Sequence, residues 1–203
     1  NPKLSDDPPG TELPHRLGTE TANFIRSKAE SKEPFFAMLS FYSVHAPIEC
    51  AKHRFEKFQA KAEQMGLTQR SEPRFVFDRT KEVRQVQDHP VYAGMMAALD
   101  DAVGLVLDAL KQSGVEDNTV VVFTSDNGGV SSGDGFATSC LPFRGGKGRQ
   151  WEGGIRQPYY IAWPGVTNGQ TSRVPATGMD FYPTFLEIPG LTLVPEKHVD
   201  DLC

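Results

Sequence analysis

Two oxygen-bearing side chains stand together just after an apolar run in the second half of the chain. Asp126 and Asn127 follow the β-branched run at 119–124 and precede Gly128 and Gly129. A carboxylate beside an amide suits a hard cation such as Ca²⁺, which prefers oxygen ligands, and glycines let the backbone turn sharply around an ion. Asp-Asn-Gly is also ordinary turn chemistry. Spacing alone therefore leaves a Ca²⁺ site and a plain turn both open.

A histidine occupies the equivalent position after another apolar run. His45 follows residues 35–42 within the order Val44-His45-Ala46-Pro47. Its imidazole exchanges protons near neutral pH, so it could act as an acid or a base there. A hydrogen-bonded loop histidine is the alternative interpretation. The other four histidines have no comparable position and are assigned no role.

A glycine-rich basic segment at 143–156 is the third candidate. It places Lys147 among several arginines and glycines. Glycines permit close backbone approach, and Lys or Arg neutralises an oxyanion, so the segment could bind an anion. It lacks the spacing of a phosphate-binding P-loop, and a basic glycine-rich loop can also be merely solvated.

The elements that must position these loops alternate between helix and strand. The apolar run 35–42 predicts a strand buried on both faces, which is typical of a parallel or mixed sheet covered by helices. Ligands bind beyond the carboxyl ends of the strands in such sheets. We therefore predict an α/β fold, with a mixed, mainly parallel sheet flanked by helices. The expected helices are 13–32, 51–65, 90–113 and 180–188, and the expected strands are 35–42, 119–124 and 159–163.

The helix at 90–113 carries the clearest apolar stripe. Pro90 suits a first helical position, and Gly114 is the expected residue just beyond the end. Side chains repeating at spacings of three and four predict a core-facing stripe. The stripe consists of Met95, Leu99, Val103, Val106 and Leu110.

Composition excludes several classes of protein. The 203 residues carry 21 Lys+Arg and 26 Asp+Glu, a net charge of −5, which argues against a nucleic-acid partner. No apolar run approaches the roughly 20 residues needed to span a bilayer. Three cysteines form no disulfide framework. Residues 1–12 are expected to be a surface loop, and the polar stretch 67–88 an exposed insertion.

Five segments taken in order resemble the sulfatase family (arylsulfatase-like) of the alkaline-phosphatase-like superfamily. The resemblance covers most of residues 15–190 and implies that residues 1–203 are the middle and later part of one sulfatase catalytic domain. The segments are FFAMLSFYSVHAP, YAGMMAALDDAVGLVLDAL, DNTVVVFTSDNGG, PFRGGKGRQWEGGIRQPYYIAWPG and MDFYPTFLEIPG.

The resemblance implies a role for each candidate residue in hydrolysis of a sulfate ester. Asp126 and Asn127 look like two protein ligands of an active-site Ca²⁺, and Asp126 would also help to deprotonate the nucleophile. Lys147 is similar to the lysine that contacts the sulfate group and the leaving oxygen. His45 resembles the histidine that assists departure of the alcohol. The implied substrate is a small-molecule or carbohydrate sulfate ester, and the implied location is extracytoplasmic: periplasmic, secreted or lysosomal.

Two further parts of the family site are not found in this sequence. The family nucleophile is a formylglycine made from the Cys or Ser of a C/S-x-P-S/A-R motif, and an Asp-Asp pair on the first strand completes the calcium site. We expect both upstream, so that this chain alone is inactive and binds Ca²⁺ weakly. Cys140 begins a loose C-x-P-x-R match to that motif. Phe143 stands where the family has Ser or Ala, and Pro142 to Lys147 align with a later block of the family sequence, so we reject Cys140 as the nucleophile.

Three alternatives remain open at this level. A phosphodiester or phosphonate monoester hydrolase of the same superfamily would use a similar anion cradle. A non-catalytic remnant would keep the fold without the nucleophile, and a Ca²⁺-binding α/β domain would carry no ester chemistry. The sequence does not predict the oligomeric state.

Overall fold

The computed structural model describes residues 10–133 and 137–197, which fall in two compact units, Asn1–Val166 and Thr167–Cys203. Each unit is described by itself. The surface loop predicted at 1–12 lies almost entirely outside the described residues. Within the described part of the chain, none of the helices combines the length and apolar character needed to cross a membrane.

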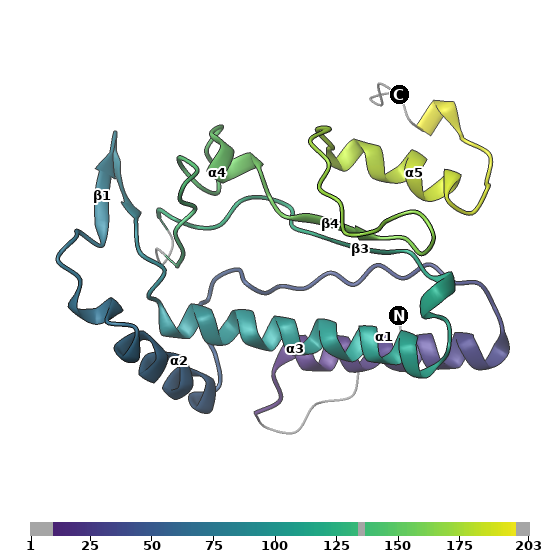
Figure 1. The fold of residues 1–203 in the computed structure, drawn as a ribbon, viewed down its shortest axis with the longest axis horizontal. Helices are drawn as coiled ribbons and strands as arrows, with labels where there is room; N and C mark the ends of the chain where they lie inside the picture. Colours follow the sequence, from purple (N-terminus) through teal and green to yellow (C-terminus); the bar gives the residue numbers. More distant parts are fainter. Residues whose placement is uncertain (1–9, 134–136, 198–203) are drawn as a thin grey trace. The chain divides into compact units, whose positions relative to one another are not determined.

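Two long helices lie side by side and form the base of the first unit (Figure 1). Helix α1 spans Leu13–Ser31 and helix α3 spans Pro90–Gln112. Pro90 stands at the start of α3 as predicted, where the His89 side chain accepts a hydrogen bond from the Tyr92 backbone N–H. Gly114, with φ of +66°, follows the end of the helix as predicted.

Small residues, rather than the predicted large ones, make the closest contact between these helices. On α3 the buried positions are mostly glycine and alanine, and of the predicted stripe only Leu110 is fully buried. On α1, Gly18 lies directly against Ala102, leaving no room for a side chain. The spacing thus predicted the helix correctly, but the most buried positions are neighbours of the predicted stripe. Small residues are buried there because they allow two backbones to approach where large apolar side chains cannot fit. The fully buried positions of α3 are Gly94, Ala98, Ala102, Ala109 and Leu110.

Helix α2, Lys52–Gln64, was also predicted, and a half-buried arginine joins it to both long helices. Arg54 donates from Nε to the Glu12 carboxylate, at 2.8 Å for the shorter contact, and its Nη1 lies 2.8 Å from Asp101 Oδ2. Glu12 precedes α1 and Asp101 belongs to α3. One guanidinium therefore fixes the relative positions of three helices.

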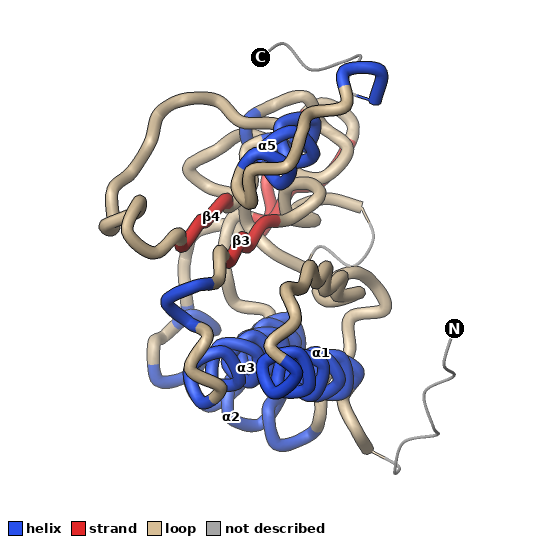
Figure 2. The backbone as a smooth tube through the Cα atoms, turned by 90° about the vertical axis from the view of Figure 1, so that its right-hand side faces the viewer, coloured by secondary structure: helices blue, strands red, loops and turns tan. Residues whose placement is uncertain are grey.

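Two short antiparallel sheets complete the first unit (Figures 1 and 2). Strand β3, Val121–Thr124, pairs with β4, Tyr159–Ala162, which confirms both predicted strands. Both pairings in the described residues are antiparallel, whereas the sequence predicted a mainly parallel sheet. The helices with small sheets fit a partial α/β domain. Short helical turns occupy Leu67–Gln69 (η1), Glu116–Asn118 (η2) and Glu152–Ile155 (α4).

The stretch predicted as an exposed insertion at 67–88 contains a hairpin, and most of its residues are exposed. Strand β1, Phe75–Asp78, pairs with β2, Lys81–Arg84. Arg84 is 7% exposed and forms ion contacts with Asp88, whose side chain is also buried. The polar composition of the stretch concealed this folding, because the buried charges neutralise one another.

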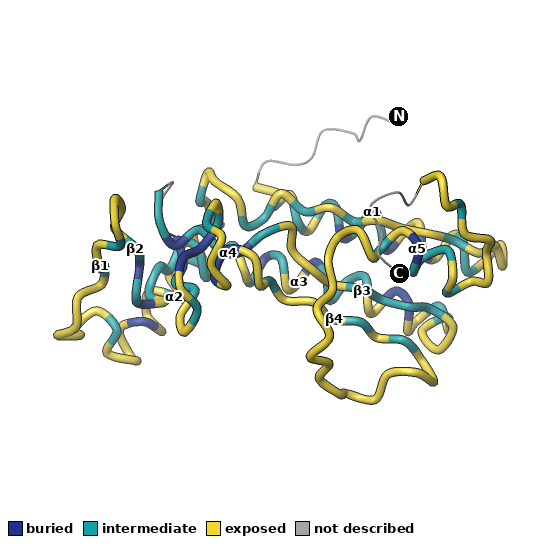
Figure 3. Tube along the Cα trace, turned by 90° about the horizontal axis from the view of Figure 1, so that it is seen from above, coloured by how far each residue is buried: buried dark blue, intermediate teal, exposed yellow. Residues whose placement is uncertain are grey.

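The predicted strand at 35–42 is not formed, and its expected burial on both faces is wrong. The segment is an extended coil that pairs with no strand among the described residues. Phe35 packs against the helical core, but Phe36, Met38 and Tyr42 are 69%, 80% and 77% exposed. Figure 3 shows how the buried positions of this unit alternate with such exposed stretches. A strand needs a hydrogen-bonded neighbour, and apolar character alone does not supply one.

The second unit is a short helical segment. Its turns are η4, Gly178–Asp180, and η5, Pro195–Lys197, and its helix is α5, Phe181–Glu187, which agrees with the prediction for 180–188. Phe181 and Phe185 stack at a centroid distance of 5.7 Å on one side of the helix.

Replacing Gly18 by alanine should destabilise the helix pair. The new Cβ would lie 2.8 Å from the Ala102 carbonyl oxygen, and overpacking of this kind costs about 1–3 kcal/mol. That loss exceeds the roughly 0.5–1 kcal/mol that alanine gains over glycine within a helix. We expect a net loss of about 1–2 kcal/mol in the free energy of unfolding of the intact protein, measured in urea.

The matched control is Gly104→Ala on α3. A Cβ added to that glycine would meet no atom of a neighbouring segment within 4 Å, so alanine should stabilise the helix by up to about 1 kcal/mol. Equal effects of the two substitutions would show that the helices do not approach as closely as described.

Candidate functional site

The loop that follows β3 is bound through backbone hydrogen bonds to the glycine-rich basic segment. The Lys147 N–H donates to the Gly129 carbonyl at 2.9 Å, and the Gly128 N–H donates to the Gly154 carbonyl at 2.9 Å. The Ser131 hydroxyl, which is fully buried, donates to the Gly145 carbonyl at 3.0 Å. These bonds hold Lys147 at a defined position relative to the loop that carries Asp126 and Asn127.

Glycines make this close contact possible. A Cβ on Gly128 would lie 1.9 Å from the Gly153 carbonyl oxygen, and one on Gly154 would lie 2.1 Å from the Arg149 carbonyl oxygen. A Cβ on Gly146 would meet the Ser131 hydroxyl at 2.3 Å. Any side chain at these positions would force the two loops apart, so the glycines serve packing as well as turning.

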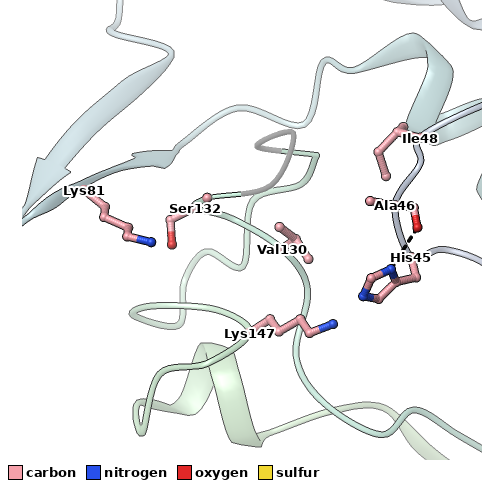
Figure 4. Close-up of a pocket in the computed structure, with 8 residues that line it drawn as sticks. His45, Ala46, Ile48, Lys81, Val130, Ser132 and Lys147 are labelled. Carbon is pink, nitrogen blue, oxygen red and sulfur yellow. Dashed lines mark hydrogen bonds between the residues drawn. The ribbon is translucent and has the colours of Figure 1, made fainter.

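His45 and Lys147 line one cavity of about 210 Å³, although they lie about a hundred residues apart in the sequence (Figure 4). Figure 4 shows the imidazole and the lysine side chain directed toward each other across it. Among the residues that the structure describes, the lining contains two lysines and no carboxylate, so the cavity suits an anion. The lining residues are His45, Ala46, Ile48, Lys81, Val130, Ser132, Gly133 and Lys147.

One ring nitrogen of His45 is held by its own loop. Nδ1 lies 2.9 Å from the Ala46 carbonyl oxygen, which can only accept, so Nδ1 carries the proton in that bond. The ring is exposed in this loop. Nε2 is therefore the nitrogen that can exchange a proton with a bound molecule.

Asp126 and Asn127 are close in sequence to Val130, which lines this cavity, but they are not among its lining residues. Asn127 Nδ2 donates to the Gly128 carbonyl at 3.0 Å, so the amide oxygen has no donor among the described residues. Asp126 is exposed, and its carboxylate has no ion-pair or hydrogen-bond partner within residues 10–133 and 137–197. Two adjacent, unsatisfied oxygens fit the ligand chemistry of Ca²⁺. No cluster of three or more His, Cys, Asp or Glu side chains able to hold a metal occurs within 10–133 and 137–197.

Sequence reasoning missed one charged residue of the cavity. Lys81, the first residue of β2, lines it beside Ser132 and Gly133. The hairpin that carries Lys81 lies in the stretch that the sequence predicted to be an insertion. The available signal for the hairpin was a polar pattern that contains the apolar residues Val76 and Val83, which face each other on β1 and β2. The pairing of these two short strands could not be predicted from composition.

Arg144, for which the sequence indicated no role, anchors that hairpin. Its guanidinium donates from Nη2 to Asp78 Oδ1 at 2.8 Å and from Nε to Asp78 Oδ2 at 3.3 Å. It also lies 4.4 Å above the Trp151 ring. The hydrogen bonds from Arg144 lower the pKa of the Asp78 carboxyl below its ordinary value, so the carboxylate stays ionised to a lower pH than that of a free aspartate.

Cys140 has the surroundings of a structural thiol. Its Sγ donates to the Gly129 carbonyl at 3.4 Å, and burial raises the pKa of the thiol above its ordinary value. A raised pKa disfavours the reactive thiolate. The geometry therefore agrees with rejecting Cys140 as a nucleophile.

Comparison with known proteins decides the family. The family model described as Sulfatase matches residues 2–191. The chain belongs to the sulfatase family. This confirms the resemblance drawn from the five sequence segments.

Individual sulfatases show the same relationship. The chain is 32% identical to a "Sulfatase" of Formosa agariphila, over all of this chain and 34% of that protein. It is 32% identical to human N-acetylgalactosamine-6-sulfatase, over 90% of this chain and 30% of the relative. The chain thus spans about a third of the length of these curated sulfatases.

Solved structures share the fold. A crystal structure of Ps i-CgsB in complex with k-i-k-neocarrahexaose superposes with a TM-score of 0.76 at 30% identity, covering 98% of this chain and 38% of that one. The putative sulfatase yidJ from Bacteroides fragilis superposes with a TM-score of 0.64 at 21% identity, covering 87% of this chain and 37% of that one. The α/β fold of the sulfatases, predicted from the sequence, is therefore confirmed.

Replacing Gly128 by alanine should separate the two loops of the sulfatase site. Because the Cβ would lie 1.9 Å from a backbone carbonyl oxygen, we expect a loss of at least about 2 kcal/mol in the unfolding free energy of the intact protein. Gly178→Ala is the control, since that position has open space around it. A Gly128→Ala protein as stable as the control would contradict the described contact.

Proposed function

We propose that the intact protein hydrolyses sulfate esters and that this chain supplies the part of the site that binds sulfate and releases the alcohol. The observation that carries the proposal is the shared cavity of His45 and Lys147. A lysine and an imidazole that face one cavity, with no carboxylate in its lining among the described residues, suit an anionic ester. Membership of the sulfatase family supports the same chemistry.

Lys147 and His45 would act on different parts of the ester. The Lys147 ammonium would bind the sulfate oxygens and stabilise the charge that grows on them as the ester bond breaks. His45, protonated at Nε2, would donate that proton to the ester oxygen, so that the alcohol leaves neutral. The Nδ1 bond to the Ala46 carbonyl holds the ring for this transfer.

Asp126 and Asn127 would hold Ca²⁺ through their two oxygens. A Ca²⁺ ion takes about six to eight oxygen ligands, so we propose that the others come from outside the described residues. When bound, the ion would add positive charge next to the sulfate. We also propose that the attacking group is a formylglycine outside this chain, so that the chain alone does not turn over.

The proposed substrate is a carbohydrate or small-molecule sulfate ester. The carbohydrate option is supported by the solved complex of Ps i-CgsB with k-i-k-neocarrahexaose. Assignment of residues 1–203 to one catalytic domain, and a location outside the cytoplasm, stay predictions from the family resemblance.

Replacing His45 by alanine should slow hydrolysis in a way that depends on the alcohol. Loss of a general acid lowers kcat by about 10²–10⁴, and the loss should be full for a sugar sulfate, whose alkoxide is a poor leaving group. For 4-nitrophenyl sulfate the loss should be about tenfold or less, because the phenolate leaves without a proton. Steady-state kinetics of the intact protein on both esters provides the measurement.

The matched control is His53→Ala, since His53 is exposed on α2. An equal loss on both esters would refute the acid role of His45. Faster hydrolysis of bis(4-nitrophenyl) phosphate than of either sulfate by the wild type would favour the phosphodiesterase alternative.

Replacing Asp126 by asparagine should weaken calcium binding. The substitution takes away the only formal charge of the carboxylate–amide pair, and we expect at least about a tenfold rise in the Kd for Ca²⁺. Calorimetric titration of the intact, chelator-treated protein measures this independently of activity. Asp117→Asn, in the η2 turn, should bind Ca²⁺ as the wild type does. Unchanged affinity in the Asp126 variant would remove this residue from the ligand set.

A further inference from the structure

The β1–β2 hairpin brings a second cation to the cavity that His45 and Lys147 line. Asp78 and Lys81 face each other across the two-residue turn, which contains Arg79 at φ of +61°. Lys81 lines the cavity from the hairpin, and Lys147 lines it from the glycine-rich segment. Figure 4 shows the Lys81 ammonium beside Ser132, on the far side of Val130 from His45.

The hairpin is fixed to both loops of the site. The Arg84 N–H donates to the Ser131 carbonyl at 2.8 Å, which joins β2 to the loop after β3. The two hydrogen bonds from Arg144 to Asp78 join the turn to the glycine-rich segment. The backbone position of Lys81 is therefore set by the same loops that position Lys147.

A sulfate bound between Lys147 and His45 leaves the Lys81 ammonium at the other end of the cavity. Its single negative charge lies with Lys147 and His45 in the proposed reaction, whereas the Lys81 ammonium faces the Ser132 end of the cavity. Among residues 10–133 and 137–197, no carboxylate lines the cavity and Lys81 has no ion-pair partner. An ammonium without an anion at a binding cavity favours ligands that bring one.

We propose that Lys81 binds a second anionic group of the substrate, so that the enzyme prefers saccharides with two anionic groups over those with one. The inference rests on the proposed function and narrows its substrate class to a sulfated saccharide that carries a further sulfate or carboxylate. Ser132 offers a hydroxyl to the same group. Lys81 is a specificity residue, because it contacts the part of the substrate that does not react.

The expected preference is about tenfold. Hydrogen bonds to charged groups give larger effects when they are buried, but Lys81 is exposed and water screens its attraction. The preference should weaken at high salt, because exposed charges are screened within about 10 Å at 0.1 M ionic strength.

Inhibition by defined disaccharides tests the inference in the intact protein. Chondroitin disaccharides with one or with two sulfate groups are compared as competitive inhibitors of 4-nitrophenyl sulfate hydrolysis. In the wild type the disulfated form should have a Ki about tenfold lower than the monosulfated form, and Lys81→Gln should reduce that ratio to about one. Lys81→Arg, which keeps the charge, should retain most of it. A ratio is insensitive to the fraction of folded enzyme.

Arg79→Gln is the matched control. Arg79 is an exposed cation of the same turn that does not line the cavity, so its removal should leave the ratio near tenfold. An equal drop in both variants would mean that the general field of the hairpin, rather than Lys81, attracts the second anion. A wild-type ratio near one, or a Lys81→Gln ratio still near tenfold, would overturn the inference.

Failure of the proposed function would look different. In that case the wild type would hydrolyse no sulfate ester, and direct calorimetric binding of the same two disaccharides would replace inhibition. A disulfated preference lost in Lys81→Gln and kept in Arg79→Gln would still support the inference, whereas equal binding by all variants would refute it.

Discussion

The candidate site of this member of the sulfatase family depends on the close approach of two glycine-rich backbones. The loop after β3 and the segment around Lys147 share hydrogen bonds at Gly128 and Gly129, with no space for a Cβ between them. Backbone hydrogen bonds of this kind position the charged side chains without engaging those side chains in the contact. The lysine and the carboxylate–amide pair thus remain available to a ligand.

Beneath these loops, the helix pair supplies a rigid base. Alanine and glycine at the α1–α3 contact bring the backbones close, and Phe35 and Val121 pack on the same core as Ala109 and Leu110. The segment leading to His45 and the strand leading to Asp126 are therefore attached to one apolar cluster. This common attachment relates two loops that are distant in the sequence.

The exposed apolar side chains beyond that cluster have a physical meaning. Phe36, Met38 and Tyr42 lie on an extended segment with no strand beside it among the described residues. Contiguous exposed apolar patches are typical of surfaces that other protein covers, whereas single exposed apolar residues are common. The chain spans about a third of the length of its curated relatives.

The sequence by itself determined the helices and two of the strands, because apolar periodicity and proline or glycine boundaries are local signals. The resemblance of five segments indicated the family. The sequence also indicated His45, Asp126 and Asn127 as candidates from their positions after apolar runs, and Lys147 from its glycine-rich basic segment. Only the tertiary structure decided that His45 and Lys147 line one cavity, that Asp126 and Asn127 do not line it, and that Lys81 does. It also showed that 35–42 is an extended coil outside both described sheets, and that alanines are buried on α3 where larger residues were expected. Strand pairing, backbone approach and cavity lining depend on which distant segments meet, and a local pattern does not contain that information.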